Sequence, residues 1–397
     1  MGPVLAWVLE RSHDASAGEV PVLIDEAARR LGATRARLYL ADVQQARLVA
    51  LPGRDTSGPR PKPAASADDD ERLAIDGSMA GLAYRTQRVQ SAHDGTTAWL
   101  PMIDGIERIG VMEAGPGLDP GWLDSCKALA SLATLLVISK TTHNDLLVER
   151  GRSRPMTLQA ELLWAFLPPR SIGTSQATST AVLEPAYDIG GDAFDHGFTN
   201  GSLHLALLDA MGHDLAAGGA SAVGLAACRS TRRAGGTLPD IATTIDRTLG
   251  QWIPNRLMTG IIANLDTVQG ELTWVNCGHP APLLIRDGHV LTAALERPVQ
   301  LPLGFGFHSQ TSPVQHRTRL EPGDRVLLYS DGVTEARSTD NELFGETRLT
   351  DTVIRSMAAG DPAPEALRRL IQNLMTHQDH RLNDDATILL TEWHPTH

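Results

Sequence analysis

The sequence predicts an α+β protein built from a small α/β domain, a helical connector and a larger layered domain. In residues 1–120 a helical pattern alternates with short strand patterns, and residues 121–170 are mainly helical in pattern. Beyond residue 170, strand patterns separated by turn dipeptides dominate, with the helical patterns in separate blocks. Sheets with segregated helices are typical of α+β domains. We therefore expect domains at 1–120 and 171–397, joined by a connector at 121–170.

Composition and charge exclude several classes of protein. The 397 residues are 42% apolar and 21% charged, and 35 basic against 47 acidic side chains give a formal charge of −12. No run of Lys or Arg stands out, so we expect neither nucleic acid nor an anionic membrane surface as a partner. The three cysteines are far apart and form no C-x-x-C pair, which argues against a disulfide framework or a zinc site and favours a cytoplasmic location.

The apolar runs are too short to predict a membrane span. The longest, residues 128–139, stops at Lys140 and falls short of the ~20 residues that a spanning helix needs. The opening MGPVLAWVLERSHD has no basic lead, so it is not a convincing targeting signal.

The first 120 residues predict a small domain of helices and paired strands. A helix is expected at 20–31, two strands about a turn at 35–51, a solvated loop at 54–72, a short helix at 77–89 and a hairpin at 98–114. The loop is rich in Pro, Ser and Asp, and the turn of the hairpin is Asp104 and Gly105.

The connector is predicted to contain two helices. Apolar residues recur at three- and four-residue spacing from Trp122 to Leu136, and no Pro or Gly interrupts this pattern before Gly151. A second apolar helix ends at Pro168 and Pro169. One solvated helix does not need so long an apolar stripe, so we expect a partner helix and hence a homodimer. Plain packing within the chain is the alternative.

The region after residue 170 predicts strands with a few helices. Strands are expected at 202–209, 257–266, 271–276, 325–330 and 386–393, and helices at 215–233, 346–358 and 364–375. The first of these helices is rich in Ala, Gly and Ser, which lets it pack close to a sheet.

Four aspartates fall at the ends of these strands. Asp192 and Asp209 flank one turn and can meet through a hairpin, Asp331 follows a strand, and Asp384 precedes one. Like charges this close repel unless a cation lies between them. Mg²⁺ and Mn²⁺ prefer carboxylate, carbonyl and water oxygens. The four acids therefore indicate a two-metal site of the kind that serves in-line displacement at phosphorus.

Five motifs carry a resemblance to a known family. DIGGDAFD, LLDAMGHD, NCGHPAPLL, YSDGVTEAR and DDATILL occur in the order and spacing of the PPM-type, metal-dependent serine/threonine protein phosphatases of the SpoIIE/RsbU branch, over roughly residues 171–393. The resemblance implies an αββα sandwich with two Mn²⁺ or Mg²⁺ ions between its sheets. It also implies that a metal-bridging water attacks phosphoserine directly. The implied metal ligands are Asp192, Asp209, Asp331, Asp384 and the carbonyl of Ala210, with Asp209 bridging.

Further residues are candidates for supporting these ligands: Asp188, Asp195, His213, Asp214, Glu335 and Asp385. The alternatives stay open here, because Asp is also a turn and cap residue, Glu335 can simply solvate a loop, and His213 can be structural. Two departures from the family pattern stand out. Asp214 occupies a position where the family usually has glycine, so its carboxylate either crowds the site, binds a further ion or faces solvent. No Arg falls in a motif that would mark a phosphate clamp.

The N-terminal region resembles a GAF domain. The resemblance rests on GSMAGLAYRTQRV followed by WLPMIDGIERIGVMEA, and it leaves the ligand of that domain open. A GAF sensor, a helical connector and a SpoIIE-type phosphatase form a recurrent arrangement. Its usual substrate is the phosphoserine form of an anti-sigma-factor antagonist of STAS type. We therefore expect a cytoplasmic protein-serine phosphatase. A catalytically inactive scaffold that binds the antagonist and a hydrolase of small phosphoesters are the rival hypotheses.

Overall fold

The computed structural model describes residues 1–52, 72–93, 95–117, 121–298, 300–379, 382 and 384–394. These residues form two compact units, Met1–Pro155 and Met156–His397. The boundary falls inside the segment 121–170 that the sequence predicts as a connector, and each half of that segment packs into its own unit. Most of the loop predicted at 54–72 lies outside the described residues.

The first unit contains one antiparallel sheet. The strands, in the order β3-β2-β1-β6-β5-β4, are β1 (Ala36–Ala41), β2 (Arg47–Ala50), β3 (Arg72–Ala74), β4 (Gln90–Ser91), β5 (Ala98–Asp104) and β6 (Glu107–Ala114). The hairpin predicted at 98–114 is the β5–β6 pair.

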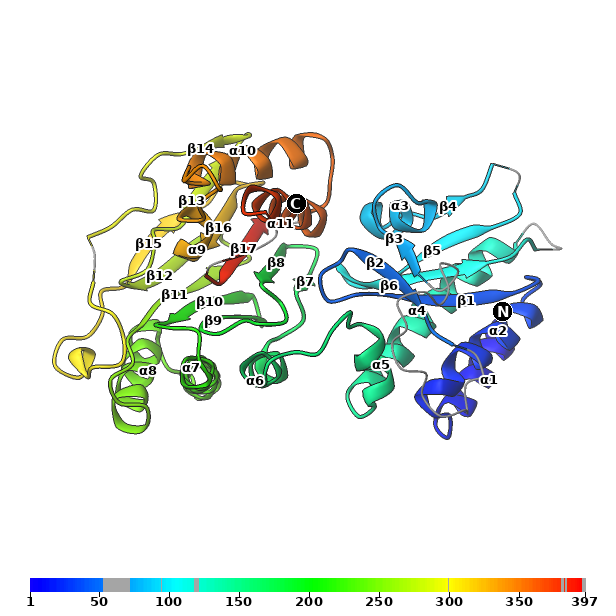
Figure 1. The fold of residues 1–397 in the computed structure, drawn as a ribbon, viewed down its shortest axis with the longest axis horizontal. Helices are drawn as coiled ribbons and strands as arrows, with labels where there is room; N and C mark the ends of the chain where they lie inside the picture. The colour runs from blue at the N-terminus through cyan, green and yellow to red at the C-terminus, as the bar shows by residue number, and fades with distance from the viewer. Residues whose placement is uncertain are drawn as a thin grey trace. The chain divides into compact units, whose positions relative to one another are not determined.

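Helices cover both faces of this sheet (Figure 1). They are α1 (Gly2–Ser12), α2 (Val20–Arg30), α3 (Met79–Thr86), α4 (Trp122–Thr141) and α5 (Asp145–Arg150). Helices α1, α2 and α4 share one hydrophobic core with the sheet, whereas α3 packs on a second core around Tyr39 and Tyr84. The sequence pattern did not predict α1.

Helix α4 buries its apolar stripe within its own unit. Cys126, Leu129 and Leu136 belong to the core of the first unit, while Leu135 is 57% exposed. The first unit therefore buries most of the apolar stripe on α4 for which a partner helix was expected. By length and composition α4 would also suffice to cross a membrane, a property that buried core helices share.

The helical pattern that no Pro or Gly interrupts between Trp122 and Gly151 does not form one continuous helix. The helix stops after Thr141, and α5 begins beyond Asn144, whose side chain accepts a hydrogen bond from the backbone N–H of Leu146. Asn at this position is a strong N-cap, so it starts a new helix rather than extending the old one.

The second unit contains two antiparallel sheets. The first has the order β15-β12-β11-β10-β9 and the second β14-β13-β16-β17-β8-β7. Their strands are β7 (Ser171–Gly173), β8 (Ala177–Glu184), β9 (Asp192–Thr199), β10 (Ser202–Ala210), β11 (Met258–Asp266), β12 (Glu271–Cys277), β13 (Leu283–Arg286), β14 (His289–Val290), β15 (His316–Arg319), β16 (Arg325–Tyr329) and β17 (Ala386–Trp393).

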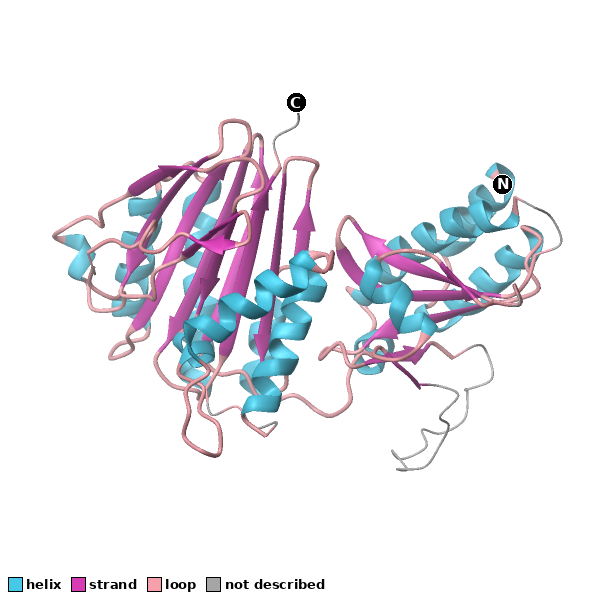
Figure 2. Cartoon of the chain, turned by 90° about the horizontal axis from the view of Figure 1, so that it is seen from above, coloured by secondary structure: helices cyan, strands magenta, loops and turns pink. Residues whose placement is uncertain are grey.

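The sheets pack face to face between two helical layers (Figures 1 and 2). The helices are α6 (Leu158–Phe166), α7 (Leu215–Arg233), α8 (Leu238–Trp252), α9 (Asp331–Thr334), α10 (Gly345–Ala358) and α11 (Ala363–His377). Helices α7 and α8 pack against the first sheet and α6 against α7, while α10 and α11 lie on the second sheet. This helix–sheet–sheet–helix order agrees with the sandwich expected from the sequence.

Helix α8 was missed by the sequence analysis although it carries a start signal. Thr237 and Asp240 form a reciprocal capping box at its first turn. The pattern of Thr followed three residues later by an acidic residue, ahead of an apolar stretch, is a recognised helix start.

Candidate metal centre

The β9–β10 hairpin brings two of the predicted ligands together. Asp192 at the start of β9 and Asp209 near the end of β10 are direct partners in the antiparallel register. Directly opposed residues point to the same face of a sheet, with Cβ atoms roughly 4.5–5.5 Å apart. The hairpin therefore presents two carboxylates side by side.

The second sheet contributes Asp331 and Asp384. Asp331 follows β16 and Asp384 precedes β17, and these strands are neighbours in the sheet. A Cβ at Gly332 would lie 2.0 Å from the backbone oxygen of Asp385 and 3.4 Å from the Cβ of Asp384. The turn after β16 thus rests directly on the residues before β17, which only glycine at 332 permits.

Asp385 ties the two sheets together. Its carboxylate accepts hydrogen bonds from the backbone N–H groups of Gly190 at 2.9 Å, Gly191 at 2.6 Å and Asp192 at 3.1 Å. The loop that leads into β9 is therefore held by a residue of the second sheet. This is a supporting role of the kind that the sequence analysis assigned to Asp385.

The paired glycines of DIGGDAFD allow the loops around the centre to touch. A Cβ at Gly190 would lie 2.3 Å from the Cα of His213, and a Cβ at Gly191 would lie 2.2 Å from the carbonyl oxygen of Ala210. Real Cβ atoms do not approach so closely. The Ala210 carbonyl therefore lies beside the residue that precedes Asp192.

Burial and mutual repulsion raise the pKa values of these carboxyl groups. The pKa of Asp209 rises to about 7, first through burial and then through the charges of Asp331, Asp384 and Asp385. Burial and the charge of Asp209 raise the pKa of Asp192 well above its usual range. For Asp331, burial and then Asp384 raise the pKa. Acids from both sheets thus influence one another at short range.

This centre fits a divalent cation. Asp192 is 2% exposed, and its Oδ2 atom is buried without a hydrogen-bond partner among the described residues. A buried acceptor without a donor is costly, and a bound cation would satisfy it while lowering the pKa of the surrounding acids. The donor set of carboxylates and a carbonyl is the one that Mg²⁺ and Mn²⁺ prefer.

The other predicted supporting residues have diverse surroundings. Asp188 is partly buried in the loop before β9, while His213 and Glu335 are exposed. Asp214 is also exposed, and it caps α7 by accepting a hydrogen bond from the backbone N–H of Ala217 at 2.8 Å. Its pKa is lowered, first by that bond and then by the side chain of Arg256.

Asp195 faces away from the metal centre. It is three residues from Asp192 in β9, and residues an odd number apart in a strand point to opposite faces. Its carboxylate accepts bonds from Arg229 Nη2 at 2.7 Å and Arg232 Nη1 at 2.9 Å, both on α7. Asp195 therefore anchors α7 to the outer face of the sheet.

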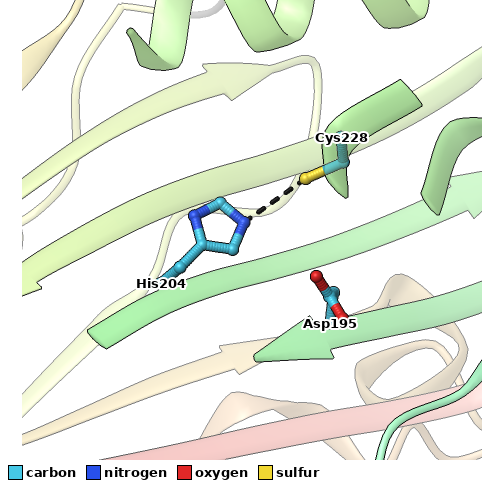
Figure 3. A group of neighbouring side chains, drawn as sticks. All are labelled: Asp195, His204 and Cys228. Carbon is cyan, nitrogen blue, oxygen red and sulfur yellow. Dashed lines mark hydrogen bonds between the residues drawn. The ribbon is translucent and has the colours of Figure 1, made fainter. Parts of the chain in front are cut away.

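Asp195 also belongs to a buried group with His204 and Cys228 (Figure 3). Their ligand-type atoms lie within 4.8 Å of one another. His204 contacts Cys228 Sγ through Nε2 at 3.3 Å and Asn264 Oδ1 through Nδ1 at 3.0 Å.

The chemistry of this buried group does not suit a metal ion. Two arginines already neutralise Asp195, and burial raises the pKa of Cys228 to about 12, whereas a metal ligand must be a thiolate. A cation here would also be repelled by both guanidinium groups. We interpret the group as a polar network within the core.

Two further residues were missed because no sequence motif marks them. Asp246 on α8 is fully buried, and it accepts bonds from the backbone N–H groups of Gly304, Phe305, Gly306 and His308. Arg256 precedes β11 and bonds to the turn that follows Asp209. Each acts on residues that are distant in sequence, so local pattern carries no signal for it.

Comparison with known families supports the resemblance of the second unit. Residues 199–394 match the model of the family described as Stage II sporulation protein E (SpoIIE). This part of the chain is therefore similar to the SpoIIE/PPM phosphatase domain.

Individual relatives are distant. Protein IcfG of Synechocystis is 26% identical over 279 residues, which cover 62% of this chain and 41% of that protein. Phosphoserine phosphatase RsbU of Bacillus subtilis is 24% identical over 211 residues, which cover 53% of this chain and 61% of that protein. The match thus spans about two fifths of the length of IcfG and about three fifths of the length of RsbU.

A solved structure agrees with the fold. The SiaA-PP2C domain of Pseudomonas aeruginosa is 20% identical, with a TM-score of 0.50, covering 59% of this chain and 94% of that one. This likeness supports a PP2C-like fold for the second unit.

Proposed function

We propose that the second unit is a metal-dependent protein-serine phosphatase. The observation that carries the proposal is the convergence of Asp192, Asp209, Asp331 and Asp384 from two facing sheets, with a buried oxygen on Asp192 that has no hydrogen-bond partner among the described residues. These four residues and the Ala210 carbonyl would hold two Mn²⁺ or Mg²⁺ ions. When bound, such ions supply Lewis-acid stabilisation and a water activated for attack on phosphorus.

The chain's own residues position this centre and leave one side accessible. Asp385 holds the backbone of the loop that ends at Asp192, so that this ligand is pre-organised. Asp331 and Asp384 are exposed, whereas Asp192 is buried. A phosphoserine side chain on a protein would approach from the side of the exposed acids.

The proposed substrate is the phosphoserine form of an anti-sigma-factor antagonist of STAS type, acted on in the cytoplasm. It is supported by the similarity to a protein named phosphoserine phosphatase RsbU. Retention of all four carboxylates argues against an inactive scaffold. A hydrolase of small phosphoesters stays the alternative, and the choice of substrate in the assay distinguishes it.

The proposed regulator is the first unit, acting as a GAF-like sensor for an unidentified ligand. Helix α6 offers a route to the centre. The N–H of Thr157 donates to the carbonyl of Tyr187 at 2.9 Å, and the indole N–H of Trp164 donates to the carbonyl of Ala186 at 2.8 Å. Both acceptors lie in the loop that leads to Asp192. A shift of α6 would therefore displace that loop.

The test is phosphate release by the purified full chain. We expect release from a phosphorylated STAS-type antagonist or a phosphoserine peptide in the presence of Mn²⁺, and loss of release when the metal is chelated. p-Nitrophenyl phosphate serves as the small-ester comparison. Turnover of the small ester with none of the phosphoproteins would favour the alternative function.

A further inference from the structure

The turn between β10 and α7, residues 211–214, directly follows Ala210, whose carbonyl is assigned to the metals, and the turn itself is exposed. The side chain of Met211 is 53% exposed, and His213 and Asp214 are exposed as well. Gly212 has a φ of +95°, a conformation that other residues rarely adopt. The orientation of this turn must therefore come from specific bonds rather than from burial.

The first of these bonds sets the direction of the Ala210 carbonyl. The N–H of Met211 donates to the carbonyl of Leu257 at 2.9 Å. That N–H and the Ala210 carbonyl belong to one planar trans peptide, in which the two groups point in opposite directions. The Ala210 carbonyl therefore points away from Leu257, and its oxygen lies beside Gly191 at the entrance to Asp192.

The next bonds come from Arg256, the neighbour of Leu257. Its Nη1 donates to the carbonyl of Met211 at 2.9 Å, and its Nη2 donates to Asp214 Oδ2 at 2.5 Å. The other oxygen of Asp214 accepts the N–H of Ala217 and caps α7. Leu257 thus fixes the peptide between Ala210 and Met211, and Arg256 fixes the next peptide, between Met211 and Gly212.

We propose that Arg256 and Asp214 form a latch that positions the Ala210 carbonyl for metal binding. Arg256 is a positioning residue, because it acts through the Met211 peptide and not on the metal. The latch gives a role to the carboxylate that replaces the family's usual glycine at 214. The proposal rests on the proposed metal centre, although not on the identity of the substrate.

Charge and geometry predict different effects, so the variants must separate them. Arg256→Met removes a positive charge and leaves Asp214 unpaired, which by charge alone would strengthen cation binding. Asp214→Asn keeps an acceptor suited to capping α7. The double variant Arg256→Met/Asp214→Asn leaves the net charge unchanged while removing the donor to Met211. Arg256→Lys restores a donor that can reach a carbonyl.

The experiment measures Mn²⁺ affinity of the metal-free full chain by titration calorimetry, with the melting temperature recorded for each variant. In the double variant we expect affinity to fall roughly 10- to 100-fold, the usual effect of losing a group that orients a metal ligand. Asp214→Asn alone should have a smaller effect, and Arg256→Lys should restore part of the affinity. Arg348→Met is the matched control, because Arg348 also forms an exposed ion pair, with Glu342 at 3.0 Å.

The outcomes separate the latch from the proposed function. A Mn²⁺ affinity that is unchanged in the double variant would overturn the latch. So would a charge effect alone, in which Arg256→Met binds Mn²⁺ more tightly and the double variant returns to the wild-type affinity. Wild-type chain that binds Mn²⁺ but releases no phosphate would refute the phosphatase while leaving the latch in place. Wild-type chain that binds no Mn²⁺ would overturn both.

Discussion

Asp192 and Asp195 are three residues apart in one strand, yet their carboxylates have opposite environments. Asp192 meets other acids, and its Oδ2 atom has no hydrogen-bond partner in the described part of the chain, whereas Asp195 is paired with two arginines. Strand periodicity predicts that the two residues face opposite sides. It does not reveal which acid meets cations from α7, because Arg229 and Arg232 lie more than thirty residues further along the chain.

We expect His204 to make the folded protein sensitive to acid. It is 2% exposed, and burial is the first cause that lowers its pKa to about 4, from an ordinary 6.5. Between these values the unfolded chain binds a proton that the folded chain does not. Stability from this residue is therefore complete above pH 6.5 and is lost as pH falls toward 4.

The variant His204→Gln tests whether His204 causes a loss of stability as pH falls. Wild type should lose more unfolding free energy than the variant between pH 7 and pH 4, by roughly 3 kcal/mol for a shift of this size. Urea unfolding of both chains across this range gives the difference. Parallel pH profiles would show that His204 does not titrate as its burial requires.

At the scale of the element, Asp246 organises the segment that follows α8. One carboxylate accepts four backbone N–H groups of residues 304–308, and Phe305 and Phe307 remain exposed around it. In Asp246→Ala these donors would lose their acceptor, at a cost of ~1–3 kcal/mol for each that stays buried.

The expected result for Asp246→Ala is a lower melting temperature and faster hydrogen exchange at the amides of Gly304, Phe305, Gly306 and His308. Asp246→Asn retains one acceptor oxygen and should give an intermediate result. Exchange at these four amides equal to wild type would contradict the role assigned to the carboxylate.

Helix α6 supports the loop before Asp192 through Trp164. In Trp164→Phe the bond to the Ala186 carbonyl is lost while an aromatic ring remains. We expect faster amide exchange in residues 185–191 and a several-fold loss of Mn²⁺ affinity, because the loop carries Asp192. Trp393→Phe is the control, since it removes an indole bond of the same 2.8 Å length, to Thr267. Equal effects of the two variants on Mn²⁺ affinity would count against a special role for α6.

Elements were predictable where local pattern decides them. The strand that carries Asp209, the strand before Asp331 and the helix at 215–233 all follow from periodicity and turn residues. Helix α8 was missed despite its capping box, and the break before α5 was missed because Asn144 acts as a cap inside an apolar pattern. Helix α8 also has apolar residues at helical spacing, from Leu238 through Ile245 to Leu249, so both kinds of signal were present there.

At the scale of the whole molecule, dimerisation stays a proposal, and fewer exposed apolar residues support it than the sequence pattern indicated. The stripe on α4 is mostly covered by the first unit, which leaves exposed residues such as Leu135 on α4 and Leu158 on α6. Coupling between the units is likewise proposed, and it requires that a ligand bind two states of the chain differently.

Light scattering and phosphatase rate test both proposals together. We expect the full chain to have twice the mass of a 42.6 kDa monomer and a rate that differs from that of residues 156–397 alone. Leu163→Pro, which disrupts α6 at a cost of ~3 kcal/mol, should shift the rate of the full chain. A monomeric full chain with the same rate as the other two proteins would refute dimerisation and coupling.

The candidate ligands could be predicted because order and spacing identify them, whereas their supports could not. Asp385 and Asp214 were candidates whose partners could not be named from the sequence. In the structure, Asp385 accepts hydrogen bonds from the backbone of residues 190–192, and Asp214 accepts one from Arg256. Such contacts join residues that are 42 or more positions apart. Tertiary structure alone brings them together.

We propose that the four aspartates hold the metal ions with which the protein hydrolyses phosphoserine. The most direct test compares Mn²⁺-dependent phosphate release by wild type, Asp209→Asn and Asp331→Asn, with Glu342→Gln on an exposed ion pair as the control. We expect at least a hundredfold loss in both aspartate variants, because even one electrostatic contact to the transition state is worth ~3–4 kcal/mol. The control should match wild type. Undiminished release in both aspartate variants would contradict the assignment of these aspartates to a catalytic metal centre.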